Sequence, residues 1–91
     1  KSKLEVSPKI TIDNQMSKNV TTYQILSGDR QGLLMDILNI FHENKVSIQS
    51  AKISTYGEKV FDIFQITDNN NKKIKNTKLI QSLEKELTKI L

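Results

Sequence analysis

The stretch Ser27 to Leu34 holds the residue types and spacing best suited to binding a small anion. It follows a strand-like run and precedes an amphipathic helical pattern, which predicts a strand-to-helix turn. We expect Asp29 to cap the helix, because its carboxylate can accept hydrogen bonds from the first-turn amides. Gly32 has no β-carbon, so a ligand can approach closely. An amino-acid carboxylate would suit such a turn; alternatively, Asp29 and Gly32 only shape it.

Groups that could react or bind a metal are scarce in the rest of the chain. There is no cysteine, which excludes disulfides and thiolate zinc sites. His42 is the single histidine, and we expect it exposed or half-buried on a helix. Asp29, Asp62 and Asp68 do not match a metal-ligand spacing, and the chain has no phosphate-binding loop or nucleophile motif. We therefore predict no catalytic residue, no metal and no cofactor.

The composition indicates a small, basic chain with a thin core. It has 91 residues, 36% hydrophobic residues and a net charge of +4. A chain of this size buries about 60–65% of its unfolded surface. A second copy could supply the missing burial, so we expect a homodimer. The 13 lysines are scattered among acidic residues and asparagines, which is typical of solubility and not of a nucleic-acid site.

The ends of the chain and its hydropathy suggest where the domain lies. No apolar run is long enough to span a membrane and no signal peptide is visible, so we expect a cytoplasmic location without membrane contact. The sequence begins with Lys1, so we expect a fragment of a larger protein. Residues 1–8 are expected to be a disordered or fraying leader, and residues 9–91 a single domain.

Hydrophobic periodicity predicts four strands and two helices. The predicted strands are 9–13, 20–26, 46–55 and 59–67, and the predicted helices are 31–44 and 77–91. The short connection between the first two strands favours an antiparallel hairpin. The order β-β-α-β-β-α predicts an α+β fold, with a four-stranded antiparallel sheet and both helices on one face.

Local patterns refine the helices and the third strand. The apolar stripe predicted for the first helix comprises Leu34, Ile37, Leu38 and Phe41, widened by Leu33 and Ile40. Asn44 is expected to end this helix in the left-handed conformation, and Asn76 or Thr77 to cap the second helix. The third strand changes phase between Ile48 and Ala51, which predicts a bulge near Gln49-Ser50.

The strand over 59–67 is apolar on both faces, since Phe64 and Phe61 point to opposite sides. We therefore expect its second face to be covered or to meet a partner. Asp62 interrupts this apolar strand. We expect it to pair with Lys52 across the hairpin, or to lie exposed at an edge.

Two motifs resemble those of a known family. The run Asp29 to Leu34 reads Asp-Arg-Gln-Gly-Leu-Leu and is similar to the Asp-Arg-Pro-Gly-Leu-Leu signature of ACT domains, with Gln31 in place of the proline. The runs 50–60 and 62–68 more narrowly resemble the C-terminal ACT domain of bifunctional uridylyltransferase/uridylyl-removing enzymes, which act on the nitrogen regulatory protein PII. Gln65 departs from that subgroup, which usually has an aromatic residue there.

The resemblance implies a ferredoxin-like ACT sandwich, in which the N-terminal strand replaces the family's usual last strand. It also implies a non-catalytic domain that binds an amino acid, here glutamine, and pairs into dimers. Such a domain would allosterically control a nucleotidyltransferase of nitrogen regulation, upstream in the same chain. A dimerisation module without ligand, or an ACT domain for another amino acid, are the alternatives. RNA recognition is disfavoured, because the strand over 59–67 lacks a basic-glycine-aromatic signature.

We expect the ligand where the Ser27–Leu34 turn meets residues 48–51 of the same or a paired chain. The expected ligand-binding residues are Asp29, Gln31, Gly32, Leu33, Gln49 and Ser50. The first-turn amides would bind the carboxylate of the ligand, and Asp29 would attract its ammonium group or hold the loop. The amide and hydroxyl groups at the predicted bulge would contact a polar ligand side chain.

Overall fold

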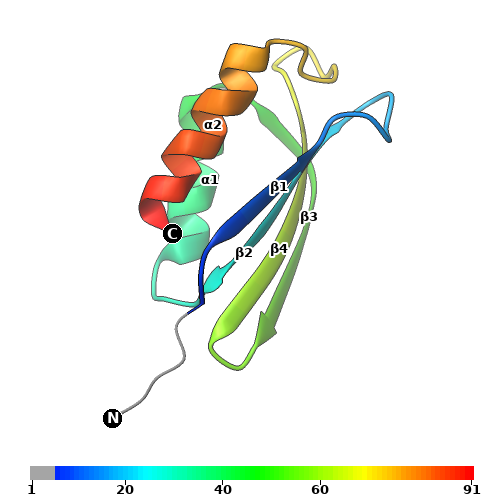
Figure 1. The fold of residues 1–91 in the computed structure, drawn as a ribbon. Helices are drawn as coiled ribbons and strands as arrows, with labels where there is room; N and C mark the ends of the chain where they lie inside the picture. The colour runs from blue at the N-terminus through cyan, green and yellow to red at the C-terminus, as the bar shows by residue number, and fades with distance from the viewer. Residues whose placement is uncertain (1–5) are drawn as a thin grey trace.

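The computed structural model describes residues 6–91 as one layer of strands covered by one layer of helices (Figure 1). The strands are β1 (Lys9–Asp13), β2 (Thr21–Gly28), β3 (Ser47–Tyr56) and β4 (Lys59–Thr67). The helices are α1 (Leu33–Glu43) and α2 (Thr77–Ile90). The predicted elements are all present. Most of the predicted leader, residues 1–5, lies outside the described residues, and residues 6–8 precede β1 without regular structure.

The sheet has the order β1-β2-β4-β3, and all neighbouring strands are antiparallel. β1 pairs with β2 from Lys9 opposite Leu26 to Asp13 opposite Thr22, which is the predicted hairpin. Both helices lie on the same face of the sheet (Figure 1). The predicted α+β sandwich is therefore confirmed.

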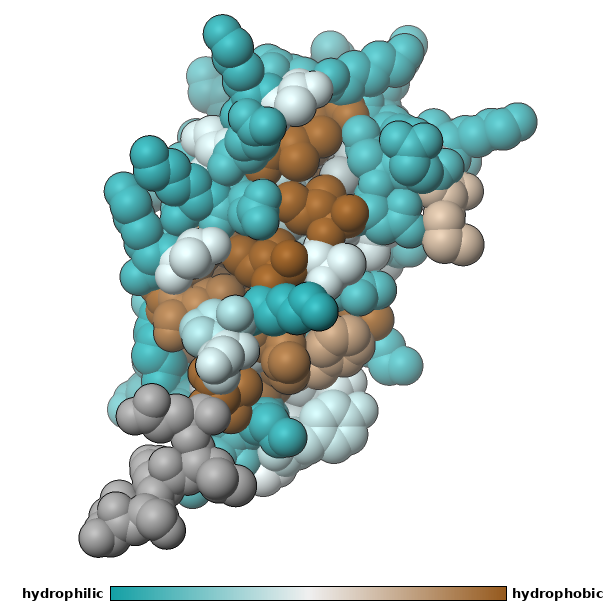
Figure 2. Space-filling model, in the orientation of Figure 1, coloured by the Kyte–Doolittle hydropathy of each residue, from teal (hydrophilic) through white to brown (hydrophobic). Residues whose placement is uncertain are grey.

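The core lies between the sheet and the helices, because alternate strand residues point toward the helices. Its fully buried aromatic residues are Tyr23, Phe41 and Phe64, which pack edge to face with ring centroids 5.9 Å and 5.3 Å apart. The Tyr23 hydroxyl donates to the Ile80 carbonyl at 2.9 Å, and burial raises the pKa of this phenol. Further apolar side chains follow the seam between α2 and β1, where Figure 2 shows them between hydrophilic borders.

The predicted bulge in β3 is confirmed. Ile48 lies opposite Ile66 and Ser50 lies opposite Gln65, so Gln49 is the extra residue in the pairing with β4. Beyond the bulge, Ala51 and the alternate residues that follow it point to the helix side of the sheet, opposite core residues of β4.

Two predicted helix ends are wrong. The N-cap of α1 is Gly32, with φ 81°, and no side chain caps this helix, so Asp29 is not the cap. A left-handed N-cap is available because glycine lacks a β-carbon. At the other end, Asn44 has φ −92° and the left-handed residue is Lys45, with φ 60°. For α2 the prediction of Asn76 is confirmed, since its side chain accepts hydrogen bonds from the amides of residues 78 and 79.

The buried face of α1 follows the predicted stripe except at Leu34. Its buried residues are Leu33, Ile37, Ile40 and Phe41, and Leu38 packs against the core. Leu34 was expected in the core, but 40% of its surface is exposed, as is 60% of Met35. The prediction for Leu34 is therefore wrong, because Leu33 occupies the core at the start of the helix.

Candidate functional site

The turn between β2 and α1 leaves helix amides available to a ligand. The Leu33 amide donates to the Arg30 carbonyl at 3.3 Å, but the amides of Gln31 and Gly32 have no hydrogen-bond partner among residues 6–91. Both of these residues are exposed, and no side chain caps the helix. Because the N-terminal N–H groups of a helix attract negative charge, the turn can receive a carboxylate.

Arg30 links this turn to both helices. Its guanidinium donates to Asp36 Oδ2 at 2.8 Å, within the first turn of α1. It also donates to the Ile90 carbonyl at 3.0 Å, at the end of α2, and to the Gln31 carbonyl at 3.1 Å. One side chain therefore contacts the turn, the first turn of α1 and the C-terminal end of α2.

Two carboxylates lie beside the turn, and one of them is buried. The Asp29 side chain is exposed, and its backbone amide donates to the Glu58 carbonyl at 2.8 Å, which fixes the turn against the β3–β4 hairpin. Asp62 is only 2% exposed on the helix side of β4. Burial raises the pKa of the Asp62 carboxyl, a hydrogen bond from the Ser54 amide opposes this, and the Asp29 charge adds to the rise. The unpartnered amides of Gln31 and Gly32 therefore lie at the same end of the molecule as these two carboxylates.

The prediction for Asp62 was wrong in both of its forms. Lys52 lies opposite Ile63 and points to the open face, whereas Asp62 lies opposite Ile53 and points to the helices. The carboxylate accepts from the Ser54 amide at 3.3 Å instead of pairing with a lysine. Strand alternation alone could have placed these two residues on opposite faces.

The polar residues of the β3 bulge lie at the other end of the sheet. Gln49 donates to Thr67 Oγ1 at 3.0 Å, and Ser50 donates to Gln65 Oε1 at 2.7 Å. The turn adjoins the Tyr56 end of β3, and six strand residues from Ser50 to that end correspond to about 20 Å. The structure therefore brings together the turn residues but does not bring Gln49 and Ser50 to them within one chain.

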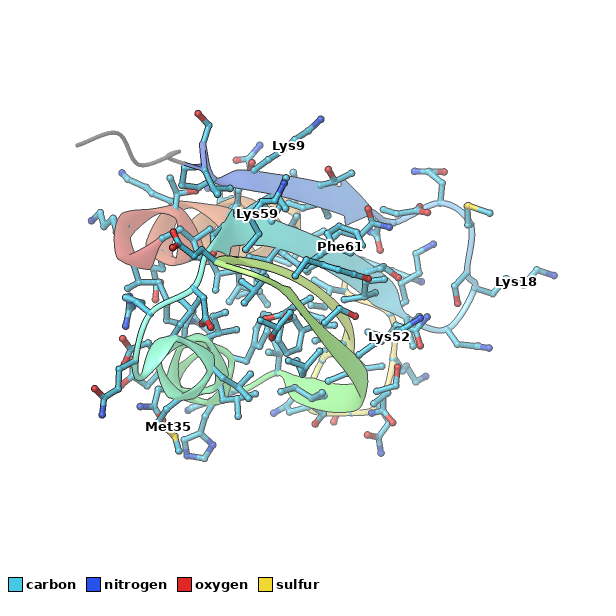
Figure 3. The ribbon with its side chains drawn as sticks, turned by 90° about the horizontal axis from the view of Figure 1, so that it is seen from below. Lys9, Lys18, Met35, Lys52, Lys59 and Phe61 are labelled. Atoms are coloured by element: carbon cyan, nitrogen blue, oxygen red, sulfur yellow. The ribbon has the colours of Figure 1, made fainter. Side chains whose placement is uncertain are left out.

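The outer edge of α1 and β3 is apolar and uncovered. Within the described residues β3 pairs only with β4, so its second edge has no strand partner. Its Ile48 and Ile53 are 37% and 45% exposed, and Leu34 and Met35 near the start of α1 are exposed as well. Figure 3 shows Met35 on the outer side of α1, away from the core. An exposed apolar strip next to a free strand edge is typical of a surface that pairs with another chain.

Other kinds of site receive no support from the described part of the chain. His42 is exposed on α1, as predicted. Residues 6–91 hold no cluster of three or more potential metal ligands. No helix in this range is long and apolar enough to cross a membrane.

Four antiparallel strands with two helices on one face define a ferredoxin-like α+β module. Residues 16–90 match the family model described as "ACR family N-terminal ACT domain". This chain therefore belongs to the ACT domain family, as the Asp29–Leu34 motif predicted.

The curated relatives are longer proteins. The chain is 42% identical over 85 residues to the bifunctional uridylyltransferase/uridylyl-removing enzyme of Pseudomonas syringae pv. tomato, covering 93% of this chain and 10% of that enzyme. It is 39% identical over 85 residues to the same enzyme of Ectopseudomonas mendocina, with equal coverage. For Pseudomonas fluorescens SBW25 the identity is 41% over 78 residues, covering 86% of this chain and 9% of the enzyme. The chain thus spans about a tenth of the length of these relatives.

Proposed function

We propose that this ACT domain senses an amino acid, with glutamine as the first candidate, and controls a nucleotidyltransferase of nitrogen regulation in the same cytoplasmic protein. The observation that carries the proposal is the uncapped start of α1 at Gly32, beside Asp29 and Asp62. The free amides suit the carboxylate of an amino acid, and the exposed Asp29 carboxylate suits its ammonium group, with the buried Asp62 adding negative charge nearby. Similarity to uridylyltransferase/uridylyl-removing enzymes supports the link to a nucleotidyltransferase. Glutamine is the ligand that the resemblance of the motifs in 50–68 implies.

Pairing of two chains through β3 would complete the site. β3 spans residues 47–56, so an antiparallel pair centred on the middle of the strand places Gln49 of one chain beside residue 54 of the other. Residue 54 of the other chain lies near the end of its β3, which leads to the β3–β4 hairpin that is bonded to the Asp29 turn. The amide of Gln49 and the hydroxyl of Ser50 would then reach a ligand on the partner's turn, although both lie about 20 Å from their own.

The same pairing would cover the apolar edge. The exposed Leu34 and Met35 of α1, together with Ile48 and Ile53 of β3, would lose contact with water in a continuous eight-stranded sheet. A ligand bound between the two chains would stabilise the dimer, since the ligand binds the dimer and not the separate chains. A dimer that tightens with ligand can change how the domain contacts its upstream catalytic domains.

Calorimetric titration tests the ligand. The chain is titrated with glutamine, glutamate and asparagine, and glutamine is expected to bind with the lowest Kd. Asp29→Asn should raise the Kd for glutamine about tenfold, because a charge-assisted contact to the ammonium group is lost. The matched control is Glu43→Gln, which removes an exposed carboxylate at the far end of α1 and should leave the Kd unchanged. Equal effects of both variants would place the ligand elsewhere.

Sedimentation separates this proposal from a dimerisation module without ligand, which the apolar edge of α1 and β3 also favours. We expect a monomer–dimer equilibrium that glutamine shifts toward the dimer. A stable dimer that releases no heat with any of the three amino acids would establish the dimerisation module. In the full-length protein, Asp29→Asn should weaken the response of the uridylyl-transfer and uridylyl-removal activities to glutamine.

A further inference from the structure

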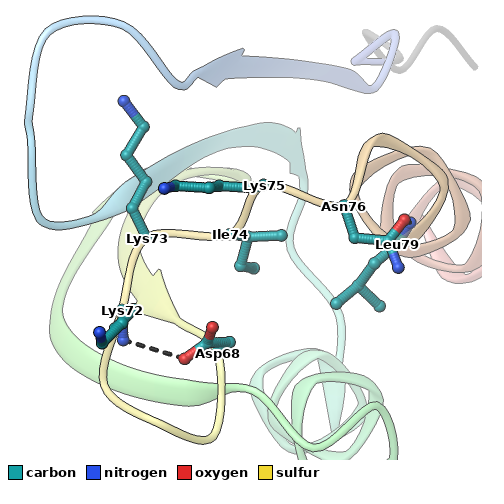
Figure 4. A pocket seen from close by; sticks show the side chains of 7 residues that line it. All are labelled: Asp68, Lys72, Lys73, Ile74, Lys75, Asn76 and Leu79. Carbon is teal, nitrogen blue, oxygen red and sulfur yellow. Dashed lines mark hydrogen bonds between the residues drawn. The ribbon is translucent and has the colours of Figure 1, made fainter.

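The loop between β4 and α2 and the connection between β1 and β2 together form a lysine-lined pocket, at the end of the sheet opposite the Asp29 turn. One depression of about 250 Å³ is lined by Lys18, Asn19, Asn71, Lys72, Lys73 and Lys75. A second depression, of about 350 Å³, shares three of these lysines and extends over Ile74 to Leu79 of α2. We call the first depression, with Lys18, Lys72, Lys73 and Lys75, the lysine pocket. Figure 4 shows Lys73 and Lys75 on the side of the loop that faces the β1–β2 connection.

The backbone of this pocket is held in place before any ligand arrives. Ile74 is 1% exposed, so the residue between the two lysines anchors the loop in the core. Asn14 donates to the Ile74 carbonyl at 3.0 Å, which ties the β1–β2 connection to the loop. Lys73 Nζ donates to the Ser17 carbonyl at 3.0 Å and makes a second link. Because both walls are fixed, little backbone conformational entropy is lost when a ligand binds.

Positive charge dominates the pocket. None of its four lysines forms an ion pair among the described residues. Two carboxylates lie near. Asp68 accepts from the Asn70 and Lys72 amides at 2.8 Å and 2.9 Å. The pKa of Asp13 is lowered, first by hydrogen bonds from two backbone amides and also by the charge of Lys73. These two acids offset half of the lysine charge, so the remainder attracts an anion.

We propose that the lysine pocket binds a small anion that carries several linked phosphate groups. Lysines act as point charges for phosphate, and four of them around one depression match a ligand with several charges. The volume of about 250 Å³ is below that of a typical drug-sized site, which favours a compact ligand. No aromatic side chain lines either depression, so the stacking platform of a single-stranded nucleic-acid site is missing there.

The test uses sodium tripolyphosphate as the probe and the 91-residue chain, which has its own core. The site variant is Lys72→Gln with Lys75→Gln, because neither side chain donates a hydrogen bond within the described residues, whereas Lys73 does. The control variant is Lys85→Gln with Lys89→Gln, which removes the same charge from exposed positions on α2. The site variant should raise the Kd about tenfold and the control less than about twofold.

Amide NMR spectra of both variants establish that they are folded, and they also locate the probe. Tripolyphosphate should shift the amides of residues 17–19 and 71–75. Equal weakening in both variants would overturn the proposal, because it would show general attraction to a basic chain. Absence of saturable binding would overturn it too, as would binding to phosphatidylglycerol vesicles without binding of tripolyphosphate. The glutamine titration is independent of this result, since its expected residues lie outside the lysine pocket.

Discussion

Replacing Asp62 by asparagine should stabilise the fold at neutral pH. The carboxyl is 2% exposed and accepts one hydrogen bond, from the Ser54 amide at 3.3 Å. Every fully buried side-chain oxygen or nitrogen of residues 6–91 has a hydrogen-bond partner. The second oxygen of Asp62 has no such partner, so it is not fully buried and keeps contact with solvent. Asparagine can accept the same hydrogen bond and can place its amino group where that oxygen meets water. It therefore removes a buried charge without leaving a buried polar atom unsatisfied.

The direction of the pH effect follows from the raised pKa of Asp62. The carboxyl has an ordinary pKa of 3.8 in the unfolded chain and a higher pKa in the folded chain, mainly because of burial. Between these two values the folded state holds the proton that the unfolded state has released. The free energy of unfolding therefore falls as the pH rises through this interval and stays lower at pH 7. Below the unfolded pKa the penalty disappears.

The magnitude follows from the geometry. A buried polar group without full hydrogen bonding costs about 1–3 kcal/mol in proteins. Asp62 keeps one hydrogen bond and some solvent contact, which places it at the lower end, so Asp62→Asn should raise the free energy of unfolding at pH 7 by about 1 kcal/mol. For a domain of this size that equals about 4–8 °C in Tm. At pH 3 the two proteins should differ by less than about 0.5 kcal/mol.

Urea unfolding at pH 3 and pH 7 measures both values, with Glu43→Gln as a control for removal of an exposed carboxylate. Destabilisation of the asparagine variant at pH 7 would refute the reasoning, because it would mean that the ionised form is the stabilised one. If the variant is more stable but binds glutamine less tightly, the buried charge is retained for ligand binding at the expense of stability.

Three further predictions concern packing and pairing. Tyr23→Phe should lower the free energy of unfolding by about 1 kcal/mol in urea titrations, because the hydrogen bond from the Tyr23 hydroxyl to the Ile80 carbonyl is lost; an equal effect of Tyr56→Phe, at an exposed tyrosine, would contradict this. Asn76→Ala should cost about 1 kcal/mol by removing the cap of α2, and an unchanged midpoint would show that the cap contributes nothing. Ile53→Lys should weaken self-association at least about tenfold in sedimentation without unfolding the chain, since this side chain is 45% exposed; an unchanged dimer would place the interface elsewhere.

The sequence predicts the elements well because its periodicity is strong. Strand alternation placed Phe64 in the core, and the phase change after Ile48 located the bulge at Gln49. The start of α1 was missed for a physical reason. The bond from the Asp29 amide to the Glu58 carbonyl depends on a hairpin about 30 residues away, which local residue types do not encode.

The candidate site could be predicted only in part. The turn motif pointed to the Asp29–Leu34 segment, and the free amides of Gln31 and Gly32 support that choice. The prediction that Gln49 joins the Asp29 turn within one chain neglects the direction of β3. This strand runs from the bulge toward the hairpin over about 20 Å, which separates Gln49 from the turn. A single chain therefore separates the expected halves of the site, and the free edge of β3 is where the proposed second copy would supply the missing half.

Charge illustrates the same difference between order along the chain and position in space. The lysines are scattered in the sequence, yet Lys18 and Lys73 meet around one depression because β1 and β2 form a hairpin whose connection reaches the β4–α2 loop. The Asp29 turn lies at the opposite end of β4, which at nine residues is about 30 Å long. That distance exceeds the screening length of about 8 Å at physiological salt, so the two charged ends act independently through solvent. A net charge of +4 therefore does not tell where charge gathers: one end holds a buried carboxylate, and the other is basic around a pocket.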